Sequence, residues 1–255
     1  SEAIFKIYKS AYTNRFDSDQ VKHLKSRKFE NVNQSDTINI KLKAGVRSTL
    51  SLDIIKNLPD FFQDEFWKYY NFSRNDIISI GNRTAYVIGF EQKEIIKEPL
   101  FKGVIFIDMK SLAILGAEFE INPEHISSAS DLYVYKKAWK YKIKPESIKY
   151  SVQYDVLNGM HYLSHVRGDL HFKYQKRRNP FLKPFHTFFE LAITQADSIN
   201  IEKFSAKELD PTGNVFFDSS YQYDDTFWNG INIISPEQDI FDALEKLNIS
   251  IEEIQ

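Results

Sequence analysis

The sequence contains no cysteine, which excludes disulfide bonds and any chemistry that needs a thiolate. This absence fits an oxidising compartment, where a stray thiol is a liability. No stretch approaches the roughly 20 consecutive apolar residues that a membrane-spanning helix needs. The chain opens on Ser1 rather than Met and lacks an apolar signal core, as expected of a mature or trimmed segment, so its start leaves export open.

Linkers and repeats are also missing. No Pro-, Gly- or Ser-rich stretch, low-complexity tract or internal repeat divides the 255 residues. A chain of this length can bury roughly three quarters of the surface that its unfolded form exposes, which suffices for one large core. We therefore expect residues 1–255 to form a single β-rich domain.

Charge is distributed unevenly along the chain. Residues 197–255 include 13 acidic and 3 basic residues, a net charge of −10, and since the whole chain carries −2, the first 196 residues carry +8. A disordered acidic segment would be poor in aromatic residues, whereas this one contains several: Phe216, Phe217, Tyr221, Tyr223, Phe227 and Trp228. Residues 235–247 predict a capped helix, with Ser235 as N-cap and Pro236 at its first position. We expect the acidic segment to dock onto the basic body, with Trp228 buried.

Alternating apolar residues predict a series of strands. The 21 Phe and 14 Tyr favour pleated, half-buried surfaces. The expected strands cover residues 85–90, 101–107, 113–121, 133–143 (ended by Pro145) and 185–193. Both faces of the strand at 101–107 are apolar, so this strand should lie centrally and be covered on both sides.

The clearest local feature is a hairpin centred on Asn158-Gly159. Apolar residues alternate over 150–156 before this pair and over 160–174 after it. Asn-Gly suits a type I′ turn, whose two positive φ angles match the twist of a two-residue hairpin. The sequence therefore predicts two long antiparallel strands joined at this turn.

Helices are expected near both ends of the chain. Apolar residues recur at helical spacing at the N-terminus: Ala3, Ile4, Ile7, Tyr8 and Ala11. A short helix over 49–58 would end at Pro59. Together with the helix at 235–247, these patterns predict an α+β fold, in which a curved, mainly antiparallel, half-barrel-like sheet carries helices near both termini.

Catalytic motifs are missing from the sequence. It has no nucleophile elbow, Ser-x-x-Lys, His-Glu-x-x-His, Walker or dinucleotide-binding pattern. Asp218, Asp224 and Asp225 fit no calcium-loop spacing. We name no catalytic residues and no cofactor. The sequence leaves open a pair of carboxylates from distant strands, as in a glycosidase.

Three histidines, His161, His165 and His171, have the same parity along one expected strand, together with Arg167 and Asp169. Four residues of strand separate Cα atoms by about 13 Å, whereas zinc–nitrogen bonds are about 2 Å long, so one metal cannot bridge His161 and His165 without a third element. A solvated sheet surface is the expectation for this face, and we name no metal ligands.

Lysines alternate with aromatic residues in one region: Lys136, Lys137, Lys140, Lys142 and Lys144 with Tyr135, Trp139 and Tyr141. A second basic run contains Lys173, Lys176, Arg177 and Arg178. This alternation is typical of platforms for single-stranded nucleic acids, on which bases stack while phosphates are neutralised. It is equally typical of a half-buried strand, and no nucleic-acid-binding motif accompanies it.

Several short segments occur together in one order: Ile4-Phe5-Lys6-Ile7-Tyr8-Lys9, Tyr86-Val87-Ile88, Lys102-Gly103-Val104-Ile105-Phe106-Ile107-Asp108, Ala113-Ile114 to Glu118-Phe119, Asp225-Thr226-Phe227-Trp228 and Ile233-Ile234-Ser235-Pro236. This set resembles the C-terminal region of Bacteroidota cell-envelope proteins known as carboxypeptidase-like regulatory-domain proteins, in which a small β-sandwich usually precedes this region. The name implies no peptidase activity, and the resemblance brings no catalytic residues. The strand at 103–108 and its successor are also similar to the sheet of periplasmic lipoprotein carriers, where a curved antiparallel sheet wraps a hydrophobic face around helices.

The resemblance implies a non-enzymatic module, exported to the periplasm or associated with the outer membrane. It would bind an envelope protein, a lipid or another apolar ligand on a curved sheet, with Phe90, Phe106 and Phe119 as the expected ligand-lining residues. A hydrolase of envelope glycans is one alternative and a nucleic-acid-binding protein is another. The favoured hypothesis predicts negligible binding of nucleic acid.

Overall fold

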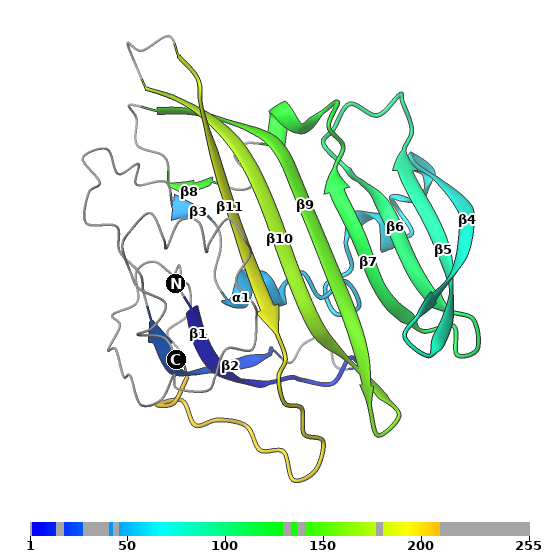
Figure 1. Ribbon diagram of the computed structural model, residues 1–255, viewed down its shortest axis with the longest axis vertical. Coiled ribbons are helices and arrows are strands. Elements are labelled where there is room, and N and C mark those ends of the chain that lie inside the picture. Colours follow the sequence, from blue (N-terminus) through cyan, green and yellow to red (C-terminus); the bar gives the residue numbers. More distant parts are fainter. Residues whose placement is uncertain are drawn as a thin grey trace, which may run out of the picture.

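One seven-stranded antiparallel sheet forms the centre of the molecule in a computed structural model, which describes residues 2–13, 18–27, 41–42, 46–129, 134–136, 141–176 and 181–209 (Figure 1). From one edge to the other, the strands are β11 (Lys183–Ala192), β10 (Met160–Lys176), β9 (Tyr141–Leu157), β7 (Ile114–Ile121), β6 (Phe101–Asp108), β5 (Arg83–Gln92) and β4 (Tyr70–Ile80). The sheet curves but stays open, with β4 and β11 as its edges. The predicted curved, mainly antiparallel sheet is confirmed.

The hairpin at Asn158-Gly159 is confirmed as well. β9 and β10 are 17 residues each, and Leu157 pairs with Met160 across a two-residue turn. Asn158 has a φ of 51° and Gly159 a φ of 78°, as a type I′ turn requires.

Gly159→Val should therefore lower the free energy of unfolding by about 1–2 kcal/mol, because a β-branched residue resists positive φ. Apart from its two chain neighbours, no described residue lies within 4 Å of a Cβ placed on Gly159, so the loss would come from the backbone. Chemical denaturation provides the measurement. The matched control is Met160→Val at the exposed neighbouring position, where extended backbone accepts valine. Equal stability of the two variants would contradict the turn geometry.

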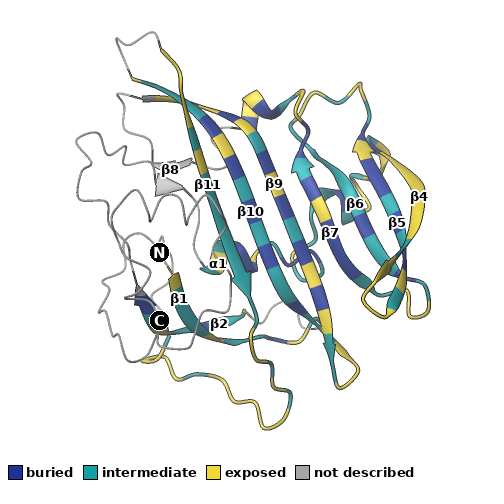
Figure 2. Cartoon of the chain, viewed as in Figure 1, coloured by how far each residue is buried: buried dark blue, intermediate teal, exposed yellow. Residues whose placement is uncertain are grey.

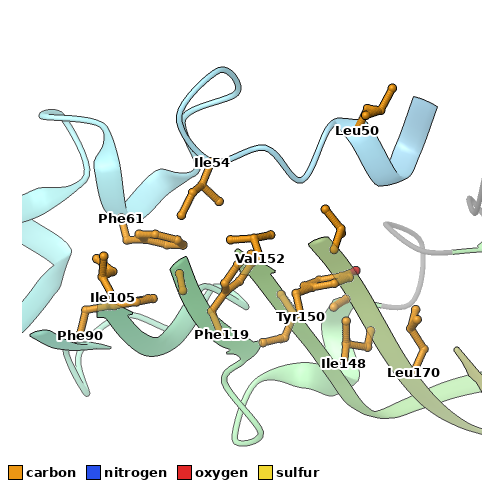
Figure 3. Packing of buried hydrophobic residues seen from close by; sticks show 14 of the residues in the cluster. Leu50, Ile54, Phe61, Phe90, Ile105, Phe119, Ile148, Tyr150, Val152 and Leu170 are labelled. Carbon is orange, nitrogen blue, oxygen red and sulfur yellow. The ribbon is translucent and has the colours of Figure 1, made fainter. Parts of the chain in front are cut away.

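Residues 46–69 cover one face of the sheet, which we call the inner face. They contain α1 (Val46–Leu50) and the 3₁₀ helices η1 (Asp60–Phe62) and η2 (Trp67–Tyr69). Phe61, fully buried, stacks on Phe90 with 4.2 Å between ring centroids and meets Phe119 edge-on at 5.5 Å (Figure 3). The core thus lies between this segment and the sheet. β6 is central, as predicted, and the described residues cover its inner face, whereas Val104 and Phe106 on the opposite, outer face are half-buried.

The N-terminal segment is a strand, and the predicted helix is wrong. β1 (Glu2–Tyr8) pairs antiparallel with β2 (Gln20–Arg27). β-Branched and aromatic residues such as Ile4, Phe5 and Ile7 favour extended backbone once a partner strand is present. Val21 of this hairpin is buried in the same core cluster as Phe61.

Two other boundaries also differ from the prediction. α1 ends at Leu50 instead of extending to residue 58. β9 continues through Pro145 because the register of the β9–β10 pair shifts there, and a proline at a bulge has no ladder hydrogen bond to donate. Residues 134–136 form a separate short strand, β8 (Val134–Lys136), which pairs with β3 (Lys41–Leu42).

A buried ionic network connects the β1–β2 hairpin to the covering segment and the sheet. Asp53, whose side chain is fully buried, lies 2.6 Å from Lys9 Nζ and accepts a hydrogen bond of 2.8 Å from the Tyr154 hydroxyl. Asp19 pairs with Lys9 and Lys56, each at 2.7 Å. Burial alone would raise the pKa of Asp19, but the hydrogen bonds from Lys56 and Lys9, the charge of Lys9 and the Ser10 N–H together hold this pKa below its ordinary value.

The described part of the acidic segment contacts the β1–β2 hairpin. Lys22 Nζ lies 2.6 Å from Glu208, and this hydrogen bond, with those of Ser205, lowers the pKa of Glu208 to about 2. The backbone N–H of Phe204 donates to the Gln20 side chain at 2.8 Å. Trp228 and the helix expected at 235–247 lie outside the described residues, so their docking stays a prediction. Within the part of the chain that the structure describes, no helix combines the length and apolar character needed to cross a membrane.

Candidate functional site

The three residues predicted to line a ligand do not share one face of the sheet. Phe90 and Phe119 lie on the inner face, 3% and 4% exposed, where Phe61 closes over them (Figure 3). Phe106 points to the outer face, where its ring packs over Gly116 of the neighbouring strand. Phe90 and Phe119 therefore belong to a closed aromatic core, and the candidate site has to be sought on the outer face.

The outer face of β9, β10 and β11 collects polar side chains by simple alternation. Buried and accessible residues alternate along β9 and β10, as Figure 2 shows. Cross-strand pairs put side chains of neighbouring strands on the same face, and β10 pairs residue by residue with β11 from His165 opposite Ala192 to Tyr174 opposite Lys183. The outer face of the two strands thus includes His165, Arg167, Asp169, His171, His186, Phe188 and Glu190.

A bulge separates His161 from the other two histidines of the predicted set. The β9–β10 register shifts between Leu163 and His165, so the alternation of β10 changes face at that point. Leu163 is 4% exposed in the core, and His161, two residues before it, has the parity of the inner face. The expectation that all three histidines face the same way is therefore wrong for His161 and right for His165 and His171.

Ion pairs connect the outer-face residues into a row. His165 Nε2 lies 2.6 Å from Glu190, and Arg167 lies 3.5 Å from Glu190 and 3.6 Å from Asp169. The Arg167 guanidinium also packs over the Phe188 ring, 5.1 Å from its centroid. Because each carboxylate has more than one cationic or imidazole neighbour, the row holds its side chains in defined positions. We give the name charge ladder to the ion-paired residues of this row, which are His165, Arg167, Asp169, His171, His186 and Glu190.

The charge ladder ends in a pair of stacked histidines. His171 and His186 lie directly opposite each other, with ring centroids 4.1 Å apart and planes inclined by 10°. Both Nε2 atoms point at one oxygen of Asp169, at 2.8 Å and 3.0 Å. All three side chains are accessible, with exposed fractions of 49%, 40% and 28% for His171, His186 and Asp169. Two imidazole nitrogens and a carboxylate oxygen could hold a metal ion here.

A second group of charges lies beside the ladder. Glu120 of β7 is 3.9 Å from both Lys102 of β6 and Lys149 of β9, and Lys149 is the cross-strand partner of Asp169. Cations and carboxylates therefore alternate from β6 to β11 across the outer face.

His186 is the ligand-type residue that sequence reasoning missed. It lies in the strand predicted at 185–193, so its alternation was available from the sequence. Its position opposite His171 depends on which strand lies beside β11 and in what register, and local patterns do not specify either.

No protein-family model, curated protein or solved structure matches this chain.

Proposed function

We propose that this protein is a non-enzymatic binding module of the cell envelope, in the periplasm or at the outer membrane, and that it binds an envelope partner through the outer face of its sheet. The observation that carries this proposal is the accessible charge ladder on β10 and β11, opposite an inner face that is already filled. The short sequence segments that follow one another in the same order as in Bacteroidota envelope proteins support this location.

The filled inner face favours a partner over an apolar ligand in the interior. Phe61 occupies the space between Phe90 and Phe119, and Ile54 of the same covering segment is 2% exposed. A lipid on the inner face would have to displace residues 46–69 and forfeit that burial, which stabilises by about 25 cal/mol per Å² of apolar surface. Binding on the outer face requires no such displacement.

The residue types on the outer face suit protein recognition. Arginine and aromatic side chains, phenylalanine included, are enriched in the cores of protein interfaces, and Arg167 stacked on Phe188 combines the two. The surrounding alternation of cations and carboxylates favours a partner of complementary charge pattern. It is less suited to a phosphate backbone, which prefers an unbroken row of cations.

The carboxylates of this face support binding over glycan hydrolysis. A glycosidase needs one carboxyl group with a raised pKa as general acid. Asp169 and Glu190 are instead both engaged by Arg167, at 3.6 Å and 3.5 Å, and by neighbouring imidazoles. Burial does raise the pKa of Asp60, but Asp60 begins η1, on the side of the sheet covered by residues 46–69.

Site-specific photo-crosslinking in the natural host tests the proposal. A benzoyl-phenylalanine replaces Gln153, which is exposed on the outer face between Gly116 and His165 of the adjacent strands. The matched control carries the same group at Ile95, a loop position that is 81% exposed. We expect the protein to fractionate with the envelope and the Gln153 variant to crosslink one envelope component that the Ile95 variant does not.

Two results would contradict the proposal. Recovery of the protein in the cytoplasmic fraction would contradict a role in the envelope. Equal crosslinking from Gln153 and Ile95 would contradict the outer face as the binding surface. Native mass spectrometry of the purified chain adds a third arm. If a lipid co-purifies with the chain and still does so after charge reversal of Arg167, the binding site lies in the interior and not on the outer face.

A further inference from the structure

We infer that Asp169, His171 and His186 form a binding site for one divalent transition-metal ion, with zinc as the best match. The three side chains come from two neighbouring strands and share the outer face. Their ligand atoms all lie within 4.8 Å of one another. This inference goes beyond the proposed binding role and stands on its own geometry.

The backbone places these three donors without help from loops. Asp169 and His171 are two residues apart on β10, so both project from the same face of one strand. His186 is the direct cross-strand partner of His171 on β11. Cross-strand neighbours have Cβ atoms about 4.5–5.5 Å apart, close enough for two imidazoles to reach one ion. A hydrogen-bonded sheet is a more rigid support for a site than a loop.

The distances are close to those of a metal-bound set. Zinc lies about 2.1 Å from imidazole nitrogen and carboxylate oxygen, so a tetrahedral site separates neighbouring donors by about 3.4 Å. Asp169 Oδ1 now lies 2.8 Å from His171 Nε2 and 3.0 Å from His186 Nε2. An ion would enter by moving the carboxylate outward by less than 1 Å and by turning the stacked rings toward each other, which accessible side chains can do.

The donor set selects the class of metal. Two imidazoles and one carboxylate suit zinc and its first-row neighbours, whereas calcium and magnesium prefer six or more oxygen ligands. Three protein donors leave a tetrahedral ion one ligand short. Water, or a donor from a bound partner, would complete it.

The local charge leaves Asp169 available to a cation. Arg167 lies 3.6 Å from Asp169, but it also lies 3.5 Å from Glu190, so these three groups together keep one negative charge. Lys149, opposite Asp169, lies 3.9 Å from Glu120. Lys173 of the same strand pairs with Glu146. Each of these three cations therefore lies near a carboxylate other than Asp169.

The test is calorimetric titration of the chelator-treated, full-length chain with Zn²⁺ alone at pH 7.5. We expect saturable binding of one equivalent. His186→Ala and His171→Ala each remove one ligand and should weaken the affinity for Zn²⁺ by at least about tenfold. Asp169→Asn, which keeps the size and shape of the side chain, should weaken it as well. The matched control is His125→Ala, just before the 3₁₀ helix η3 (Ile126–Ala129), which should bind zinc as the unmodified chain does.

A second readout separates a built site from adventitious ions. Co²⁺ bound by two imidazoles and a carboxylate in a tetrahedral arrangement gives intense visible absorption bands, whereas Co²⁺ on scattered surface carboxylates stays octahedral and pale. We expect the intense bands in the unmodified chain and in His125→Ala, and their loss in His186→Ala. Pale spectra throughout, equal zinc affinity in His186→Ala and the unmodified chain, or no saturable binding would each overturn the inference. Circular dichroism verifies that every variant is folded.

Discussion

Phe61→Ala is expected to lower the free energy of unfolding by about 3–5 kcal/mol, the range for removing a fully buried aromatic ring. Phe61 has no exposed surface and contacts three rings of the inner face: Phe90 at 4.2 Å, Phe119 at 5.5 Å and Phe101 at 6.1 Å. The alanine variant would leave a cavity between the covering segment and the sheet, because the strands cannot move inward to fill it. Denaturation by urea measures the loss.

Trp67→Ala is the matched control for this prediction. Trp67 is another large aromatic residue of the covering segment, but it is 52% exposed and contacts Phe72 at the edge of the sheet. Its removal should cost clearly less than removal of Phe61, about 1 kcal/mol. Equal, small losses in both variants would contradict the packing in Figure 3. The inner face would then be open, and an apolar ligand against Phe90 and Phe119 would become the better hypothesis.

Local sequence was sufficient where one short segment of the chain carries the structural requirement. The Asn158-Gly159 turn was predictable because few residue pairs accept two positive φ angles in succession. The strand at 101–107 was predictable for a similar reason, since apolar residues on both faces favour a central position. Neither prediction needs a partner strand.

Errors arose where a distant segment decides the conformation. Over the first eleven residues the helical and strand patterns overlap, and pairing with β2 selects the strand. The bulge before His165 shifts the alternation by one residue and turns His161 to the other face, although no local residue marks the shift. The closure over Phe90 and Phe119 comes from Phe61, about 30 residues earlier than Phe90 in the chain, so the sequence around the two rings could not reveal it.

The candidate site combines both cases. His165, Arg167, Asp169 and His171 were assigned to one face from alternation alone, and the structure agrees. What alternation could not supply is His186, because the distance between two histidines on different strands depends on register. A metal site that spans strands is therefore visible only after the strands are aligned.

The second large effect is expected for the buried network around Asp53. Asp53→Ala should lower the free energy of unfolding by about 3 kcal/mol, the lower end of the range for removing one member of a buried ion pair. The lower end applies because Lys9 keeps Asp19 at 2.7 Å and is not left unpaired. The Tyr154 hydroxyl loses the acceptor of its proton at 2.8 Å, and this donor is then left unsatisfied in the core.

Two further variants separate the charge of Asp53 from its hydrogen bond. Asp53→Asn keeps an acceptor for Tyr154 and should cost less than the alanine variant, about 1–2 kcal/mol. Tyr154→Phe removes the donor, and combining it with Asp53→Asn gives the coupling energy of the pair by a double-mutant cycle. Burial and then the nearby charge of Asp53 raise the pKa of Tyr154, so the hydroxyl stays protonated and can donate.

Asp64→Ala, an exposed carboxylate in the same covering segment, is the matched control and should stay within about 0.5 kcal/mol of the unmodified chain. Burial of Val21 and the contacts of Asp53 hold the β1–β2 hairpin to the core by two different interactions. If hydrophobic burial alone anchors the hairpin, Asp53→Ala will be as stable as Asp64→Ala. If the network anchors it, β1 amides will lose protection from hydrogen exchange in Asp53→Ala, while those of β9 outside the Tyr154 contact keep theirs. The reason is that Asp53→Ala removes the contact between Lys9 and the covering segment at 2.6 Å, so that the hairpin opens more readily than the sheet.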